Sequence, residues 1–265
     1  MNMTRFYAAC WAEYLKIIRS KILWITILAF LFIPLMIGVL MYVIKNPEMA
    51  YKFGLIGSKA AMIRFGGADW SVYLGLLSQI IAGVGLLGFG FVTSWVFGRE
   101  YSDHTAKDLL ALPIPRTLVV LAKFIAVFCW CFLLTLILFI CGLLIGSIIQ
   151  LSGWSDQLIY NNAYIYFLGS LLAALLSTPV AFFASYGRGY LSPLGFVILT
   201  LILAQFVGIV GLGPYFPWAI PLLSAGSSAD EGDSLRAISY IILILTSLLG
   251  FVATLAWWRY ADQGK

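Results

Sequence analysis

The sequence has little charge. Only 10% of its 265 residues are Asp, Glu, Lys or Arg, whereas 62% are hydrophobic, and its mean hydropathy is +1.00. An average soluble domain carries about 25% charged residues, which it needs to cover its water-facing surface. The composition therefore excludes a soluble globular protein and a disordered chain, and it indicates a polytopic membrane protein.

Residues that carry out chemistry inside a membrane are also scarce. The chain has one histidine, His104, and no acidic or basic residue lies deep within an apolar run. Proton-coupled transporters and intramembrane proteases usually keep such residues in their spans, where an ionisable group is costly and is retained for function. The sequence thus disfavours an enzyme, a proton-driven transporter and an autonomous channel. We expect no catalytic residue and no bound cofactor in this chain.

Neither the cysteines nor a glycine motif changes this interpretation. The four cysteines lack the spacing of a metal site, and none falls in an expected extracytoplasmic loop, so we expect neither a metal site nor a disulfide: Cys10, Cys129, Cys131 and Cys141. Residues 83–88 match the dinucleotide-binding pattern G-x-G-x-x-G, but they lie inside an apolar run rather than after a strand. Their glycines indicate close contact between helices instead: Gly83, Gly85 and Gly88. Gly142 and Gly146, in the next apolar run, likewise predict close contact between helices.

Six apolar runs are long enough to cross a bilayer, whose hydrocarbon core of about 30 Å needs about 20 helical residues. They cover residues 22–43, 72–97, 118–149, 163–185, 191–212 and 237–258. Residues 1–21 place aromatic and charged side chains on opposite faces of a helix, which predicts an amphipathic helix at the membrane surface. The expected fold is an all-α membrane protein with one transmembrane domain over residues 1–265.

The basic residues favour cytoplasmic termini. With the N-terminus inside, eleven Lys and Arg residues lie on the cytoplasmic side and five lie outside, as the positive-inside rule requires. The basic residues on the cytoplasmic side explain the net charge of +5, so the charge does not indicate a nucleic-acid partner. Lys123 lies near the start of the third run, and we expect its side chain to extend to the interface.

The segment between the second and third runs is the most polar part of the chain. Residues 97–116 hold seven of the chain's 28 Lys, Arg, His, Asp and Glu residues. Ser102 or Asp103 can cap a short helix, which Pro113 would end. Asp103 and Lys107 have the i,i+4 spacing of an ion pair. A charged helix over residues 102–112 is therefore expected at the cytoplasmic surface.

One face of this expected helix is apolar and suits docking to a partner protein: Thr105, Leu109 and Leu112. The alternative is a polar loop that only returns the chain to the membrane. The order Glu100, Thr105, Leu109-Leu110, Pro113, Arg116 resembles the cytoplasmic loop of type-2 permeases of ATP-binding-cassette transporters. It is similar in particular to the bacitracin-resistance and lantibiotic-immunity group. Residues 188–195 resemble that group's short inner loop, and residues 214–221 resemble its broken outer segment.

The resemblance implies a permease that works with a second permease copy or a paralogue and with ATPase subunits, which bind ATP and magnesium. The chain has no G-x-x-x-x-G-K-[ST] loop, so the ATPase is a separate chain. Motion of the ATPase would reach the membrane through these residues: Glu100, Ser102, Asp103, Thr105, Lys107, Asp108, Leu109, Leu110, Leu112, Pro113 and Arg116. Glu100 and Leu109 lie outside the expected spans, so the fold should tolerate their replacement.

The expected function is export across the bacterial cytoplasmic membrane. Charge-free spans rich in aromatic residues favour a hydrophobic or amphipathic cargo, such as a peptide antibiotic, a drug or a lipid-like molecule. Gln79 and Gln205 would face a pathway or a partner helix. Three prolines would break the outer segment and shape a vestibule: Pro214, Pro217 and Pro221. The alternative function is a membrane scaffold or regulatory subunit that transports nothing.

Overall fold

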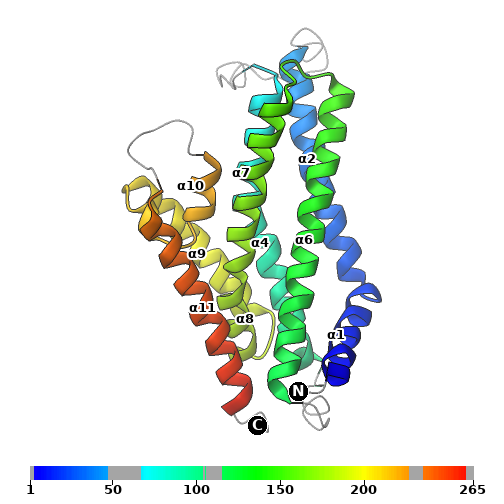
Figure 1. Ribbon diagram of the computed structural model, residues 1–265, viewed down its shortest axis with the longest axis vertical. Helices are drawn as coiled ribbons and strands as arrows, with labels where there is room; N and C mark the ends of the chain where they lie inside the picture. Colours follow the sequence, from blue (N-terminus) through cyan, green and yellow to red (C-terminus); the bar gives the residue numbers. More distant parts are fainter. Residues whose placement is uncertain (1–2, 47–66, 104, 106–114, 227–234, 261–265) are drawn as a thin grey trace.

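The computed structural model describes residues 3–46, 67–103, 105, 115–226 and 235–260, which form a bundle of helices (Figure 1). The helices are α1 (Met3–Ile18), α2 (Lys21–Lys45), α4 (Trp70–Ser102), α6 (Arg116–Ile149), α7 (Asp156–Leu175), α8 (Ser177–Tyr186), α9 (Leu191–Ile209), the 3₁₀ turn η2 (Gly213–Tyr215), α10 (Ile220–Gly226) and α11 (Ala237–Tyr260). Six helical segments are long and apolar enough to cross a membrane, with α7 and α8 together forming one of them. The expected all-helical fold with six spans is confirmed.

Several helix ends differ from the limits of the apolar runs. The fourth span begins at Asp156 rather than 163, because its first two turns are helical although they carry polar residues. The fifth span ends at Ile209 rather than 212, because the chain turns at Gly211, where φ is +78°. The second span continues to Ser102 instead of ending at 97. Hydropathy thus located the apolar centre of each helix and missed its polar ends.

The α4 helix forms the centre of the bundle and packs against α2, α6, α7, α8, α9 and α10. Two of its glycines allow close approach. A Cβ atom added to Gly88 would lie 2.6 Å from the ring of Phe30 in α2, and one added to Gly90 would lie 2.7 Å from Val197 in α9. Gly88 therefore lies where α2 and α4 approach each other closely.

Gly83 and Gly85 are less constrained than Gly88. An added Cβ at Gly83 would be at an ordinary 3.7 Å from Leu222, and one at Gly85 would meet only side chains of α4 itself. The close packing predicted for the third run is present in α6. There, added Cβ atoms would lie 2.7 Å from Leu77 at Gly142 and 2.5 Å from the Trp70 ring at Gly146.

The fourth span contains a break at Leu176, between α7 and α8. Pro179 has no N–H group and so cannot bond to the carbonyl of Leu175 four residues earlier. The Thr178 hydroxyl donates to that carbonyl instead, at 3.0 Å. The polar group freed by the proline is thus satisfied within the span, as an apolar environment requires.

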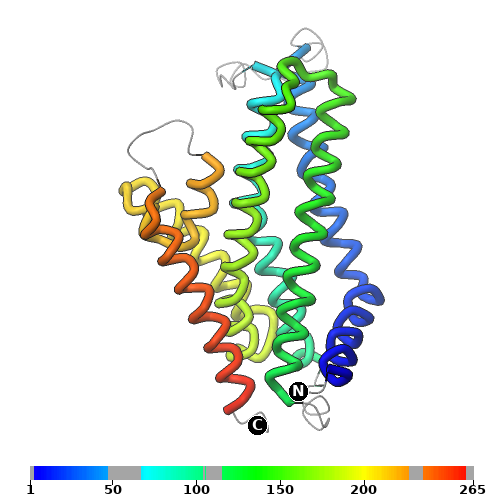
Figure 2. Tube along the Cα trace, in the orientation of Figure 1, coloured from blue at the N-terminus to red at the C-terminus, as the bar shows by residue number. Residues whose placement is uncertain are grey.

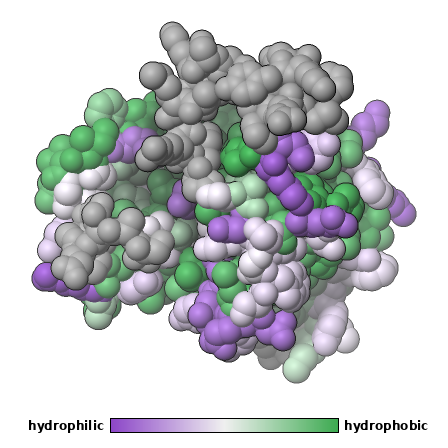
Figure 3. Space-filling model, turned by 90° about the horizontal axis from the view of Figure 1, so that it is seen from above, coloured by the Kyte–Doolittle hydropathy of each residue, from purple (hydrophilic) through white to green (hydrophobic). Residues whose placement is uncertain are grey.

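The outside of the bundle is largely apolar, as a lipid-facing surface must be. Large exposed side chains include Ile148 (79% exposed), Leu249 (69%) and Ile209 (83%). Viewed along the bundle axis, hydrophobic and hydrophilic side chains are interspersed over the end face (Figure 3). Helix α1 and the C-terminal end of α11 lie at the same end of the bundle (Figures 1 and 2), as six crossings require.

After α9, the segment with the three prolines does not form a continuous helix. Pro214 lies in η2, Pro217 follows it, and Pro221 is the second residue of the short α10. The break expected from these prolines is therefore present. Helix α10 packs against α4 and α7, which places this segment over the central helix.

Candidate functional site

The polar end of α4 is the first part of the predicted coupling segment. Ser102 is the last residue of α4 and Asp103 is its C-cap, so both residues end a long helix. Their expected role as the cap of a following short helix stays a prediction, because most of that helix lies outside the described residues. The Asp103 carboxylate pairs with Arg99 at 3.1 Å, within α4. The Thr105 N–H donates to the carbonyl of Glu100 at 2.9 Å, so Thr105 is also bonded to the last turn of α4.

The middle of the predicted segment lies outside the described residues: Lys107, Asp108, Leu109, Leu110, Leu112 and Pro113. The helix over 102–112 and its apolar face therefore stay predictions. Arg116 is the first residue of α6, and its Nη1 donates to the carbonyl of Trp258 in α11 at 3.4 Å. The two ends of the segment are thus fixed to the bundle, at α4 and at α6.

Glu100 is buried, with only 3% of its surface exposed, although it follows the apolar part of α4. Its two carboxylate oxygens pair with two different lysines. Lys123 of α6 lies 2.5 Å from Oε2, and Lys16 of α1 lies 2.7 Å from Oε1. One carboxylate therefore joins three helices that are separate in the sequence.

A second carboxylate completes this arrangement. Glu13 of α1 lies 2.8 Å from the Lys16 ammonium and 3.3 Å from that of Lys123. Lys123 also donates to the carbonyl of Val96 in α4, at 2.9 Å. We call Glu13, Lys16, Glu100 and Lys123 the ion-pair cluster. Acidic and basic groups alternate around it, and its formal charge is zero.

Lys123 does not extend to the membrane surface, contrary to the sequence-based expectation. Its side chain is 0% exposed, and its ammonium group donates hydrogen bonds to two carboxylates and a backbone carbonyl inside the protein. The expectation that the fold tolerates loss of Glu100 also fails. Removing Glu100 would leave the buried Lys123 short of a counter-charge, which is strongly destabilising.

The protonation of Lys16 agrees with this geometry. Burial lowers the pKa of Lys16, but the nearby carboxylates of Glu13 and Glu100 outweigh that effect and raise the pKa above its ordinary value. Lys16 is therefore charged at neutral pH. Pairing and burial together make the cluster a rigid joint, since separating its members would expose uncompensated charges in an apolar environment.

The α1 helix is amphipathic, as predicted, and two charged residues of its polar face, Glu13 and Lys16, are turned toward the protein, whereas Arg5 and Arg19 are exposed. Glu13 is buried against α4 and α6, whereas Tyr7, Trp11 and Tyr14 are exposed at 71%, 60% and 50%. Aromatic side chains of this kind prefer the membrane interface. Glu13 and Lys16 thus hold α1 to the bundle, and its aromatic face is left for lipid.

The predicted pathway residues lie on the outside of the subunit. Gln79 of α4 and Gln205 of α9 are both exposed. Within the described part of the chain, no group of three or more His, Cys, Asp or Glu residues is arranged to hold a metal ion. The site that the structure does assemble is a joint between helices, made by the ion-pair cluster.

Comparison with known proteins decides what kind of membrane protein this is. A family model described as ABC-2 family transporter protein matches residues 9–207, a stretch that includes the whole ion-pair cluster. The chain belongs to the ABC-2 transporter family. The bacitracin transport permease protein BCRB of Bacillus licheniformis is 28% identical over 196 residues, which are 74% of this chain and 90% of that protein.

Family membership gives the polar segment a context. An ABC-2 permease is the membrane subunit of its transporter, lacks an ATPase domain of its own, and works with ATPase subunits. The protein is thus a multi-pass membrane permease subunit. The ion-pair cluster lies at the end of the bundle where the polar segment joins α4 to α6. An ATPase subunit outside the membrane can reach this end of the bundle.

Proposed function

We propose that this permease exports a hydrophobic or amphipathic cargo across the bacterial cytoplasmic membrane, driven by ATP and magnesium bound to a separate ATPase subunit. A peptide antibiotic, a drug or a lipid-like molecule would meet this description. Support comes from the similar protein, whose name assigns it to bacitracin transport. It also comes from spans that carry no charged side chain at their centres.

The observation that carries the coupling part of this proposal is the ion-pair cluster. The ATPase would push on the segment between Asp103 and Arg116. Glu100 lies three residues before this segment and Lys123 lies seven residues after its end. Their ion pair links the two sides, and Lys16 brings in α1. A displacement of the segment would then move α1, α4 and α6 together.

The exposed glutamines support a second permease copy, or a paralogue, against α4 and α9. An amide side chain facing hydrocarbon without a hydrogen-bond partner is unfavourable by several kcal/mol on apolar-transfer scales, roughly 4–8 kcal/mol for complete transfer. Gln79 and Gln205 are both exposed in the isolated subunit. In our proposal they face the partner permease or the cargo path between the two, beneath the segment broken by the prolines.

We also propose that both termini and the polar segment lie in the cytoplasm, where the ATPase is. The eleven-to-five distribution of basic residues supports this orientation. Arg99 and Arg116, at the two ends of the segment, belong to the larger set.

The test is a change of the expected docking face in cells that also produce the partner ATPase. Leu109→Asp places a charge in the proposed contact and should weaken ATPase binding by on the order of 2–5 kcal/mol. Leu109→Met is the matched control, since it keeps an apolar side chain of similar volume. Pull-down of the ATPase measures binding, and ATP-dependent export measures function.

Leu109→Asp should lose both activities while reaching the membrane in normal amounts, and Leu109→Met should keep both. Full binding and export in Leu109→Asp would refute the role of this segment. A second assay addresses transport itself. If no cargo of the proposed class stimulates ATP hydrolysis by the reconstituted pair in proteoliposomes, the chain is a scaffold or regulatory subunit instead.

A further inference from the structure

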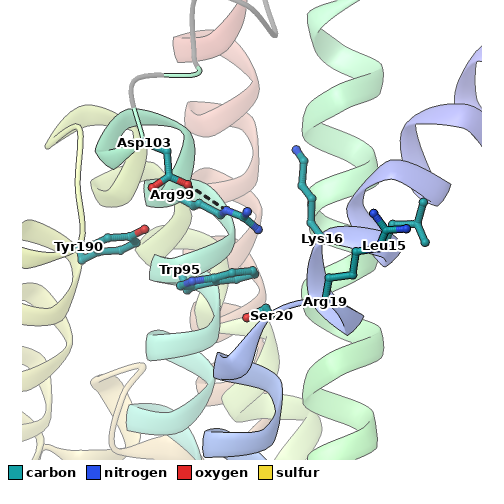
Figure 4. A pocket seen from close by; sticks show the side chains of 8 residues that line it. All are labelled: Leu15, Lys16, Arg19, Ser20, Trp95, Arg99, Asp103 and Tyr190. Carbon is teal, nitrogen blue, oxygen red and sulfur yellow. Dashed lines mark hydrogen bonds and ion pairs between the residues drawn. The ribbon is translucent and has the colours of Figure 1, made fainter.

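A polar cavity lies beside the ion-pair cluster, between α1, α4 and the start of α9. Its volume is about 460 Å³, within the range of small-molecule sites. Figure 4 shows its lining, with Arg99 extending from α4 toward α1. The residues that line it are Leu15, Lys16, Arg19, Ser20, Trp95, Arg99, Asp103 and Tyr190.

The lining carries more positive than negative charge. Three basic residues line it, Lys16, Arg19 and Arg99, together with a single carboxylate, that of Asp103. Lys16 is already neutralised by Glu13 and Glu100, and the Arg99 Nε atom pairs with Asp103. The side chain of Arg19 makes no ion pair with any residue that the structure describes. Among the described residues, one positive charge is therefore left without a counter-charge at the cavity.

The Arg99 side chain is fixed by two contacts within α4. Its guanidinium lies 5.0 Å from the centre of the Trp95 ring, and its Nε lies 3.1 Å from Asp103. These contacts leave the two Nη groups as donors. Guanidinium donors arranged in this planar fork match the oxygens of a phosphate group.

The cavity lies where the apolar segments end. Ser20 directly precedes α2, the first span, and Arg99 is the first charged residue after the apolar part of α4. Trp95 and Tyr190 line the wall, and such aromatic side chains favour the headgroup level. Apolar surface from Leu15 and Trp95 adjoins the cations. A ligand with an anionic head and an apolar tail would satisfy both parts of this lining.

We propose that the cavity binds the phosphate-bearing headgroup of an anionic membrane lipid. The phosphate interacts with the Nη groups of Arg99 and with Arg19, whose exposed side chain turns into the cavity on binding, while the acyl chains leave past the apolar wall of Leu15 and Trp95. The lipid then supplies the counter-charge that Arg19 lacks and bridges α1 to α4. The site is separate from the exposed faces of α4 and α9 proposed for the cargo, so it does not depend on the proposed transport function.

The test is native mass spectrometry of the purified permease titrated with phosphatidylglycerol or phosphatidylcholine. The protein should bind the anionic lipid more tightly. Arg19→Gln should weaken phosphatidylglycerol binding roughly fivefold, and the double change Arg19→Gln with Arg99→Gln roughly twentyfold, from the usual contribution of a basic residue near a lipid surface. Arg19 is exposed, so its replacement should leave the fold intact.

Arg259→Gln is the matched control, because Arg259 is a basic residue at the end of α11 and does not line the cavity. It should leave binding unchanged. Equal affinity for the two lipids would overturn the proposal, as would an unchanged affinity in Arg19→Gln. Glycerol phosphate serves as a soluble competitor. If it binds the lipid-free protein as tightly and displaces phosphatidylglycerol, the site takes a free phosphate ester and the lipid assignment is wrong.

Discussion

Replacing Lys123 by methionine tests the ion-pair cluster most directly. Methionine keeps much of the side-chain length and removes the ammonium group. Lys123 is fully buried and donates to Glu100, Glu13 and the carbonyl of Val96. Its loss leaves two buried carboxylates with one lysine, so the free energy of unfolding should fall by about 3–5 kcal/mol.

A second change separates the loss of charge balance from the loss of packing. In the double variant Lys123→Met with Glu100→Gln, Glu13 and Lys16 still neutralise each other, so no carboxylate is left unpaired. Replacing both members of a buried pair is much less harmful than replacing one. The double variant should therefore be more stable than Lys123→Met alone.

Lys45→Met is the matched control for the loss of a lysine. Lys45 is exposed and donates to the carbonyls of Ile149 and Gln150 at 2.8 and 2.7 Å, at the far end of α2 and α6. Water can replace these bonds, so the expected loss is at most about 1 kcal/mol. Unfolding in mixed micelles titrated with sodium dodecyl sulfate, followed by fluorescence of the nine tryptophans, gives the free energies. If Lys123→Met is no less stable than Lys45→Met, the cluster does not hold these helices together.

Two further predictions concern packing and topology. Gly146→Ala would place a Cβ 2.5 Å from a tryptophan ring and should destabilise the protein by about 1–3 kcal/mol, whereas Gly195→Ala, with nothing within 4 Å, should not lower the thermal midpoint. Equal midpoints would contradict the close contact of α6 with α4. In a cysteine-free background, a membrane-impermeant thiol reagent should label Ser228→Cys but not Ser102→Cys in intact cells. Labelling of Ser102→Cys would reverse the proposed orientation.

The number and type of the helices were predictable because they depend on local composition. An apolar run of about 20 residues forms a helix in a bilayer whatever its neighbours are, since the backbone must satisfy its own hydrogen bonds there. The ends of the helices depend on other factors. Ser102 and Asp103 have the side chains of an N-cap, yet they lie at the C-terminal end of α4, where Arg99 is the partner of Asp103.

The ion-pair cluster was not predictable in the same way. Glu100 is 84 residues from Lys16 and 23 residues from Lys123, and no local pattern joins them. The sequence contained two signals that gain meaning only together. A single lysine lay within the third apolar run, and an acidic residue lay on the polar face of the N-terminal helix. Each signal alone has an ordinary explanation. The Lys123 side chain could extend to the membrane interface, and the Glu13 carboxylate could face water.

The position of the cluster constrains how force can pass through the permease. Because the four charges are balanced and three of them are buried, the contacts among α1, α4 and α6 resist separation more strongly than an apolar contact that slides. A push on the segment between α4 and α6 is then expected to move α1 as well, together with its exposed aromatic face. The proposed lipid site lies across the same α1–α4 contact, so an anionic lipid would strengthen the joint through which we propose that the ATPase acts. In this arrangement, lipid charge and ATP-driven movement influence the same contact, and neither needs to reach the centre of the spans.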